Sequence, residues 1–410
     1  MTNPLYDPFA VLQKVYGGGA YLKQALGDTP IEEAHRARTA KVCYGVLEND
    51  LYLDFCIKSF APKNPKLPVR ILLKVSLYFL LFLGKARYMV TDSAVSLLKK
   101  LGKGGAAGFV NAFLRNFDAE KLALPADRPS RLSVQYSFPP FAVSRLLKEY
   151  GEEAEEIMRH RPARTFVRFA GTPAQKYLGL PHEDTPFAGL YAYPNFRRDE
   201  GYDRGEYTFQ SVGSVAVCAA VEPCGELLDA CAAPGGKSVL LAGRCARVTA
   251  CELHEHRAKL IGSYASRMGA ENISVVCRDS SVHDPAYDGR FDAVLADAPC
   301  SGYGVVGENP DIKLLRREED IPALHRAQLA ILSACAPYVR AGGHLYYSTC
   351  SVFGEENDGT VSAFLKRNPD FSAEEISSPL GHKRTRFGLQ FLPHLSMGAG
   401  FYVCKMRKKA

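Results

Sequence analysis

Apolar residues recur at three- and four-residue steps along residues 8–117. This spacing places them on one face of a helix, so the pattern predicts helices throughout this part of the chain. Glycine and proline clusters interrupt the pattern and mark the expected helix ends, at residues 17–19, 62–68 and 102–105. We therefore predict an all-α bundle as the first domain, residues 1–120.

The longest apolar run, residues 71–83, contains Lys74. A bilayer span needs roughly 20 apolar residues, so this run is too short to cross a membrane and predicts a buried helix. The amino terminus has no basic stretch followed by an apolar core, so we expect no signal peptide. No membrane partner is expected.

The pattern is mixed in the middle of the chain. Residues 118–129 contain two prolines and predict a connector, whereas residues 141–160 predict a helix and residues 165–169 a short strand. We predict a small α+β middle domain, residues 121–204.

After Gly205, apolar runs of strand length alternate with helical segments. This alternation is typical of a parallel sheet flanked by helices, and it predicts an open α/β domain over residues 205–410. The expected fold is therefore multidomain. The strands are expected at residues 226–229, 247–252, 273–277, 291–297, 343–349 and 401–405.

The first of these strands runs into a segment of small residues and glycines, residues 229–238. Small residues let a ligand approach the backbone, and the helix expected to begin near Ser238 directs N–H donors at the same place. The segment is not a P-loop, because Cys231 occupies the position of that motif's first glycine and Pro234 lies inside the loop. Taken alone, it is compatible with a ligand-binding loop or with a tight turn that binds nothing.

Acidic residues end or closely follow four successive expected strands: Asp229, Glu252, Asp279 and Asp297. Each alone is more often a helix cap or a turn former. In open α/β sheets, however, ligands bind outside the carboxyl ends of the strands, where an acidic residue can accept hydrogen bonds from ribose hydroxyls. Together the four residues predict a pocket for an adenosine-containing cofactor.

Cysteines follow two of the expected strands, Cys300 in DAPCSG and Cys350 in YSTCS. A lone cysteine at a strand end is usually a small buried hydrophobic residue. Two beside one predicted cofactor pocket favour thiol chemistry, because a thiolate is a strong nucleophile. The aromatic residue of the D-P-P-Y motif of amino-group methyltransferases is absent, and Cys300 stands in its place.

The stretches CAAPGGKS, DAPCSGYG, PDIKLLRR and YSTCS resemble the motifs of the Sun/Nop family of RNA cytosine-5 methyltransferases. EYTFQSVGS, residues 206–214, resembles the segment that leads into the family's catalytic domain. The amino-terminal stretches GGAYL, YGVL and GFVNAFLRN resemble the NusB-like domain of the bacterial RsmB-type members, which are 16S rRNA methyltransferases. The resemblance covers nearly the whole chain and implies a NusB-like bundle followed by a Rossmann-like methyltransferase domain.

The resemblance implies S-adenosyl-L-methionine as cofactor and assigns the site residues. Cys350 would attack C6 of a flipped-out cytosine, Cys300 would help remove the C5 proton, and Asp297 would hydrogen-bond the cytosine edge. The implied cofactor-binding residues are Cys231, Ala232, Ala233, Pro234, Gly235, Gly236, Lys237, Glu252, Asp279 and Asp297.

The sequence departs from the family pattern at three places. Residues 307–309 are Gly-Glu-Asn where basic residues are usual, residues 398–402 lack an acidic residue, and Ala170 follows Arg168-Phe169 where Arg followed by Asn is common. These differences imply altered RNA contacts, while the catalytic set is intact. Candidate phosphate contacts are Arg159, Arg161, Arg164, Arg168, Lys383, Arg384 and Arg386.

Composition is compatible with this interpretation. Apolar residues make up 47% and charged residues 23%, as in ordinary globular proteins, and the net charge of +7 suits a polyanionic partner such as RNA. The 12 cysteines form no C-x-x-C pair, which favours reduced thiols and a cytoplasmic protein. The histidines lack zinc-site spacing, so no metal is expected, and we expect a monomer.

Three alternatives stay open at this stage. The same chemistry could act on tRNA rather than 16S rRNA. The chain could be a ribosome-assembly or antitermination factor that binds RNA through the bundle and keeps an inactive methyltransferase fold. It could also methylate DNA with Cys300 as nucleophile, although the second cysteine and the NusB-like part disfavour this.

Overall fold

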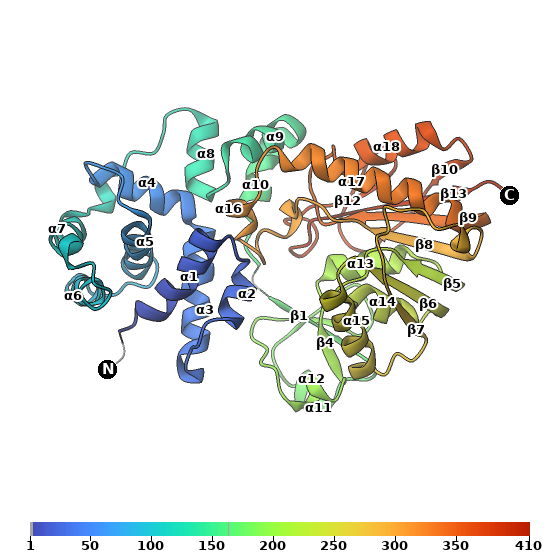
Figure 1. The fold of residues 1–410 in the computed structure, drawn as a ribbon, viewed down its shortest axis with the longest axis horizontal. Helices are drawn as coiled ribbons and strands as arrows, with labels where there is room; N and C mark the ends of the chain where they lie inside the picture. Colours follow the sequence, from blue (N-terminus) through green and yellow to red (C-terminus); the bar gives the residue numbers. More distant parts are fainter. Residues whose placement is uncertain (1–2, 163) are drawn as a thin grey trace. The chain divides into compact units, whose positions relative to one another are not determined.

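The structure is a computed structural model that describes residues 3–162 and 164–410, and these fall into two compact units (Figure 1). The helical unit comprises the chain up to Arg159 together with Val306–Arg316. The catalytic unit, named for the site described below, comprises His160–Val305 and Arg317–Ala410. The expected division into residues 1–120, 121–204 and 205–410 stays a prediction.

The helical unit forms where the apolar periodicity predicts it. Its helices end at the expected breakers, as at Gly19, which caps α1 with φ of 65°. The elements are α1 (Tyr6–Gly18), α2 (Leu22–Gly27), α3 (Glu33–Glu48), α4 (Asp50–Phe60), α5 (Leu67–Leu81), α6 (Arg87–Lys100), α7 (Ala107–Asn116), α8 (Arg128–Tyr136), α9 (Pro140–Tyr150), α10 (Ala154–Arg159) and α16 (Ile312–Leu315), with 3₁₀ turns at Gly104–Ala106, Ala119–Lys121 and Gly151–Glu153.

Helix α5 is buried in this unit, as its apolar run predicts, and its lysine is neutralised by two carboxylates. Lys74 is 2% exposed, and its Nζ lies 2.5 Å from Asp50 Oδ1 and 3.1 Å from Asp54 Oδ1. The hydroxyl of Tyr16 also donates to Asp50. Pairing with the two carboxylates offsets part of the cost of burying the ammonium group.

A segment from the second half of the chain, Val306–Arg316, belongs to the helical unit. Asp311 Oδ2 accepts a hydrogen bond from the backbone N–H of Leu22 at the start of α2, 2.8 Å. The buried Lys313 donates to the carbonyls of Glu48 and Tyr136, at 3.0 and 3.2 Å. The segment thus satisfies backbone groups that helix ends leave unpaired.

The catalytic unit begins with a small antiparallel sheet in the order β2-β3-β1-β4. Its strands are β1 (Thr165–Phe169), β2 (Glu183–Asp184), β3 (Leu190–Tyr193) and β4 (Tyr207–Phe209), accompanied by α11 (Gln175–Leu178) and α12 (Glu200–Asp203). The expected strand at residues 165–169 is confirmed, whereas the expected helix at 141–160 is divided into α9 and α10.

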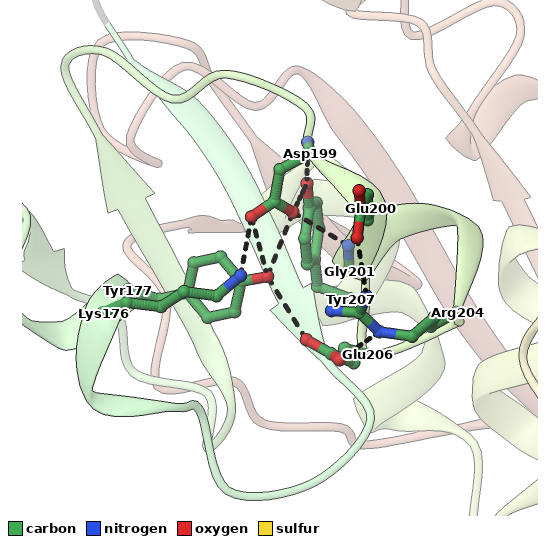
Figure 2. A network of polar contacts seen from close by, with 8 residues as sticks. All are labelled: Lys176, Tyr177, Asp199, Glu200, Gly201, Arg204, Glu206 and Tyr207. Atoms are coloured by element: carbon green, nitrogen blue, oxygen red, sulfur yellow. Dashed lines mark hydrogen bonds and ion pairs between the residues drawn. The ribbon is translucent and has the colours of Figure 1, made fainter.

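Asp199 organises the loops of this small sheet (Figure 2). Its carboxylate accepts hydrogen bonds from the hydroxyls of Tyr177 and Tyr207, each 3.0 Å, from Lys176 at 2.8 Å and from the backbone of Gly201 at 3.0 Å. Partial burial raises the pKa of Asp199, but these donors outweigh it and lower that pKa to about 2. The network fixes the segment that leads into the large sheet.

The large sheet has the order β11-β12-β13-β9-β8-β5-β6-β7, with β10 paired to β13. Helices α13 and α14 pack on one face, with Leu227, and α17 and α18 pack on the other, with Leu228. The elements are α13 (Val212–Ala220), β5 (Cys224–Asp229), α14 (Gly236–Ala242), β6 (Cys245–Glu252), α15 (Glu255–Arg267), β7 (Ile273–Cys277), β8 (Phe291–Asp297), α17 (Asp320–Cys335), β9 (Val339–Thr349), α18 (Asp358–Arg367), β10 (Phe371–Glu374), β11 (Lys383–Arg384), β12 (Gly388–Phe391) and β13 (Phe401–Lys408), with 3₁₀ turns at Pro285–Tyr287, Tyr303–Val305 and Ala336–Tyr338.

Strands β5 to β9 are mutually parallel, and all expected strands are present. The sheet also has an antiparallel edge, which the sequence did not predict. Strand β13 runs antiparallel to β9, with Tyr402 opposite Thr349, and β10 and β12 also pair antiparallel with β13. The short strands β10 to β12, rather than one crossover helix, connect α18 to β13, and an antiparallel edge on such sheets is common.

Candidate active site

The glycine loop connects β5 to α14. Asp229, at the end of β5, is buried and accepts a hydrogen bond from the Ser238 hydroxyl at 2.7 Å. Gly235 has φ of 108°, and a Cβ there would lie 3.2 Å from the Cα of Ile261. The loop therefore needs glycine both for its backbone conformation and for its packing against α15.

The second carboxylate oxygen of Asp229, Oδ1, is buried and has no hydrogen-bond partner. Burial, together with the charge of Asp297, raises the pKa of Asp229 to about 6. Asp229 is 0% exposed and does not line the cavity described below, so it holds the glycine loop through Ser238.

A cavity of about 420 Å³ lies at the carboxyl ends of the central strands. The predicted site residues that line it are Cys231, Ala233, Glu252, Asp279, Asp297, Cys300 and Cys350. Those that do not line it are Ala232, Pro234, Gly235, Gly236 and Lys237. The cavity thus brings five of the ten predicted cofactor residues and both motif cysteines to one place, whereas most of the glycine loop lies outside its lining.

Two carboxylates lie at one end of this cavity. Glu252 is 4% exposed, and its Oε1 accepts hydrogen bonds from the backbone of His254 at 3.1 Å and from Arg257 at 3.3 Å. Asp279 accepts from the backbone and hydroxyl of Ser281, which lower its pKa. The neighbouring Leu253 is 53% exposed at the cavity wall, an apolar surface that suits a flat ring.

Asp297, at the end of β8, is held between two partners. Its Oδ2 lies 2.6 Å from the Nζ of Lys237, and its Oδ1 accepts a hydrogen bond from the Ser348 hydroxyl at 2.6 Å. Burial acts to lower the pKa of Lys237, but Asp297 more than offsets it, so that this pKa is raised and the lysine is cationic. Lys237 therefore acts on the cavity through Asp297.

The two motif cysteines are in contact. Their sulfur atoms lie 3.1 Å apart, and the backbone N–H of Cys350 donates to the sulfur of Cys300 at 3.2 Å. The hydrogen bond with Cys350, together with burial and the charge of Glu356, raises the pKa of the Cys300 thiol. Cys300 is 8% exposed and Cys350 is partly exposed.

Glu356 links the two cysteine loops and was not predicted from the sequence. This fully buried carboxylate accepts hydrogen bonds from the backbone and hydroxyl of Ser301, at 2.8 and 2.5 Å, and from the Ser351 hydroxyl at 2.5 Å. Gln328 also donates to it, 3.0 Å, and to the carbonyl of Pro299. Because Ser301 and Ser351 directly follow the cysteines, Glu356 fixes one loop relative to the other.

Other cavity residues were also absent from the predicted set of site residues, namely Ala230, Leu253, His254, Arg257, Arg278, Ser280, Ala298, Pro299 and Ile331. Leu253 and His254 directly follow Glu252, so their position after a strand end was an available signal. Ile331 belongs to α17 and has no such local signal.

The departures from the family pattern have structural counterparts. Residues 307–309 lie in the segment that belongs to the helical unit. Within the catalytic unit, Gly400 packs on Gly304, where a Cβ on Gly400 would lie 2.3 Å from the Cα of Gly304. Residues 398–402 therefore support the Cys300 loop through close backbone packing.

Most of the candidate phosphate contacts have other partners. Arg168 is 8% exposed and donates to Gln210 at 2.7 Å, so the expectation that it lies at the surface is wrong. Gln210 in turn donates to the carbonyl of Gly236, which ties β1 to the glycine loop. The exposed arginines pair with carboxylates: Arg159 with Glu155 and Glu156, Arg164 with Glu183, and Arg384 with Glu375.

Within the described residues, no group of three or more His, Cys, Asp and Glu side chains is arranged to hold a metal ion. The helices of residues 3–162 and 164–410 include none that is both long and apolar enough to cross a membrane.

Two family models match the chain. The model described as 16S rRNA methyltransferase RsmB/F matches residues 217–407, and the NusB family model matches residues 9–119.

Similar proteins span nearly the same length. The probable ribosomal RNA small subunit methyltransferase B of Bacillus subtilis (strain 168) is 33% identical over 95% of this chain and 94% of its own. Ribosomal RNA small subunit methyltransferase B of Sodalis glossinidius is 32% identical over 93% and 91%, respectively.

Solved structures share the fold. The crystal structure of PH0851 has a TM-score of 0.83 at 21% identity and covers 100% of this chain and 99% of that one. NSun6 from Pyrococcus horikoshii with SFG has a TM-score of 0.58 at 20% identity, over 67% of this chain and 99% of that one.

Proposed function

The chain belongs to the RsmB/F family of 16S rRNA methyltransferases, and from that premise we propose that it methylates C5 of a cytosine in 16S rRNA through a covalent intermediate on Cys350. The observation that carries the proposal is the shared cavity, which Glu252, Asp297, Cys300 and Cys350 all line. Methyl transfer to a base requires the cofactor and the nucleophilic thiol in the same cavity, and this cavity has carboxylates for the cofactor as well as both cysteines.

The enzyme uses S-adenosyl-L-methionine, which supplies an electrophilic methyl group when bound. The residues fit this cofactor. We infer that Glu252 accepts hydrogen bonds from its ribose hydroxyls, that Asp279 binds the adenine edge, and that the exposed face of Leu253 packs on the ring. Cys231 and Ala233 of the glycine loop would contact the methionine part.

Cys350 starts the chemistry in this proposal. C5 of cytosine is a weak carbon nucleophile, and addition of the Cys350 thiolate at C6 converts the ring to an enamine that is nucleophilic at C5. Cys350 is the more exposed of the two cysteines, as a nucleophile that attacks substrate must be. Asp297, held by Lys237 and Ser348, would accept a hydrogen bond from the amino group at the cytosine edge, and the positive charge of Lys237 behind it would offset the negative charge that thiolate addition puts on the activated ring.

Cys300 ends the chemistry. It accepts the proton from C5, and the electron pair of that C–H bond re-forms the ring double bond as the bond between C6 and the sulfur of Cys350 breaks. Only the thiolate of Cys300 can accept this proton, and because the pKa of the Cys300 thiol is raised, the thiol must first lose its own proton to solvent. The raised pKa then makes the thiolate a strong base for this step. The 3.1 Å between the sulfurs is compatible with action on adjacent ring carbons.

The relatives named ribosomal RNA small subunit methyltransferase B support 16S rRNA as substrate. We further propose that the protein acts in the cytoplasm, as a monomer, on naked or partly assembled small-subunit RNA.

The test is methyl transfer from labelled S-adenosyl-L-methionine to 16S rRNA transcribed without modifications, followed by bisulfite mapping. A tRNA transcript and small-subunit particles assembled from the unmodified 16S rRNA are assayed in parallel. We expect 5-methylcytosine at a defined position of the 16S rRNA. Modification of tRNA alone, or of neither RNA nor small-subunit particles, would contradict the proposal.

A further inference from the structure

The positive charge of the chain is concentrated in the helical unit, whereas the site described above belongs to the catalytic unit. Residues 84–116, which contain α6 and α7, carry six basic residues and one carboxylate, a net charge of +5 within a chain whose total is +7. The basic residues are Lys85, Arg87, Lys99, Lys100, Lys103 and Arg115, and the carboxylate is Asp92.

A groove of about 760 Å³ lies on this surface. It is called the α6–α7 groove here, and the lining residues that matter are Arg87, Tyr88, Asp92, Lys99, Asn111 and Arg115. Gly108 also lines it, and a Cβ there would meet no atom within 4 Å, so the groove is open at that point.

The cations of the α6–α7 groove are not neutralised by carboxylates. Within the part of the chain that the structure describes, Lys99 and Arg115 form no ion pair, in contrast to Arg159, Arg164 and Arg384. Arg87 donates to the carbonyls of Leu114 and Phe117, 2.6 and 2.7 Å, which fixes the end of α7 while its charge remains. The groove thus keeps a positive potential that would attract a polyanion.

The α6–α7 groove has an aromatic side chain that can stack on an unpaired base and polar side chains that can hydrogen-bond its edge. Tyr88 lines the groove and is 78% exposed, which is unusual for an aromatic side chain. Met89, its neighbour in the sequence, is 44% exposed. Aromatic side chains in positively charged grooves stack on the bases of single strands, and the Watson–Crick edges of bases are accessible only where the bases are unpaired. Asp92 can accept a hydrogen bond from the amino group of cytosine, and the Asn111 amide can both donate and accept.

We propose that the α6–α7 groove binds a single-stranded segment of RNA, with Lys99 and Arg115 on phosphates and Tyr88 stacked on a base. The inference rests on the proposed function for the identity of the RNA, and it adds a second contact outside the catalytic unit. Such a contact adds to affinity without touching the reacting base, so it acts on RNA binding rather than on the chemical step.

The test compares full-length variants of matched charge. Lys99→Glu with Arg115→Glu reverses the two groove cations, whereas Arg38→Glu with Lys41→Glu makes the same charge change at exposed positions of α3. Lys99→Gln with Arg115→Gln removes the contacts without adding repulsion, and Tyr88→Ala removes the stacking ring. Arg87 is left unchanged because it holds α7.

Binding is measured by anisotropy of a short fluorescein-labelled unstructured RNA over a series of salt concentrations. Loss of two phosphate contacts should lower the slope of log Kd against log salt by about 1.4 in both groove double variants, with the α3 variant matching the wild type. Tyr88→Ala should weaken binding roughly 5- to 150-fold. With 16S rRNA, the groove variants should raise KM and keep kcat.

Equal effects of the groove and α3 variants, or no effect of either, would overturn the inference. Tighter binding of a duplex than of the single strand would overturn the single-strand assignment. These outcomes can be told apart from failure of the proposed function. If the wild type methylates RNA and the groove variants bind RNA as the wild type does, only the groove inference is refuted. If RNA binding depends on the groove but no methylation occurs, only the proposed function is refuted.

Discussion

The sulfur atoms of Cys300 and Cys350 lie 3.1 Å apart although the residues are 50 positions apart in the chain. They follow the neighbouring parallel strands β8 and β9, where Asp297 is opposite Ser348. Adjacent parallel strands end at the same edge of a sheet, so the sheet itself brings the thiols together. Two thiols at this distance can serve neighbouring carbons of one pyrimidine ring.

Glu356 should be required for the relative placement of these thiols. Glu356→Ala would leave the hydroxyls of Ser301 and Ser351 and the Gln328 amide without their buried acceptor, which should lower the free energy of unfolding by about 3 kcal/mol. A displaced cysteine loop should lower kcat by about 100-fold, with KM for RNA unchanged. Urea unfolding and steady-state kinetics measure both effects.

Glu356→Gln keeps the size of the side chain and should lie between wild type and alanine in both measurements. Glu375→Ala is the control, since Glu375 is 92% exposed and pairs with Arg384 at the surface. A destabilised Glu356→Ala enzyme with full kcat would show that Glu356 has only a structural role.

Glu252 should contribute strongly to cofactor affinity. Glu252→Ala removes a buried carboxylate whose hydrogen bonds to ribose hydroxyls would be worth about 1.5 to 3 kcal/mol, or roughly 10- to 150-fold in Kd. Calorimetry with S-adenosyl-L-methionine measures the change. Glu255→Ala, on the exposed side of α15 and paired with Lys259, should bind the cofactor as wild type does. Unchanged affinity of Glu252→Ala would remove this residue from the site.

Asp229 predicts a pH dependence of stability. Its pKa of about 6 in the folded protein exceeds the value of about 3.9 of an unfolded chain, so folding favours the protonated form. Stability should therefore fall as pH rises from about 4 to about 6. Asp229→Asn keeps an acceptor for Ser238 and has no charge to bury, so at pH 7 it should be about 3 kcal/mol more stable than wild type.

Urea unfolding of the cofactor-free protein between pH 4 and pH 7 tests this. The gain of Asp229→Asn over wild type should vanish near pH 4, where both side chains are neutral. A gain that does not depend on pH would mean that charge burial at Asp229 is not its cause.

The sequence predicts best where local pattern and structure coincide. The bounds expected for β7 and β8, residues 273–277 and 291–297, match the structure, because apolar strand runs there end at polar residues. The carboxyl ends of parallel strands form one edge, so the sequence also suffices to bring Glu252, Asp297 and both cysteines together.

Features that depend on distant partners had no local signal. Glu356 lies in a turn, and its partner Ser301 is 55 positions away. The segment Val306–Arg316 joins the helical unit through Asp311 and Lys313, whose partners are backbone groups at helix ends. Strands β11 and β12 have two and four residues, too few for an alternating pattern to identify them.

The division of labour between the two cysteines is the central claim, and denaturing electrophoresis of protein mixed with 16S rRNA and S-adenosyl-L-methionine tests it most directly. Cys300→Ala should still add to C6 but release slowly, so a protein–RNA species that survives denaturation should accumulate. Cys350→Ala should give neither this species nor methylation. Adducts in Cys350→Ala and none in Cys300→Ala would reverse the assignment of the nucleophile, and methylation by both single variants would contradict the covalent mechanism.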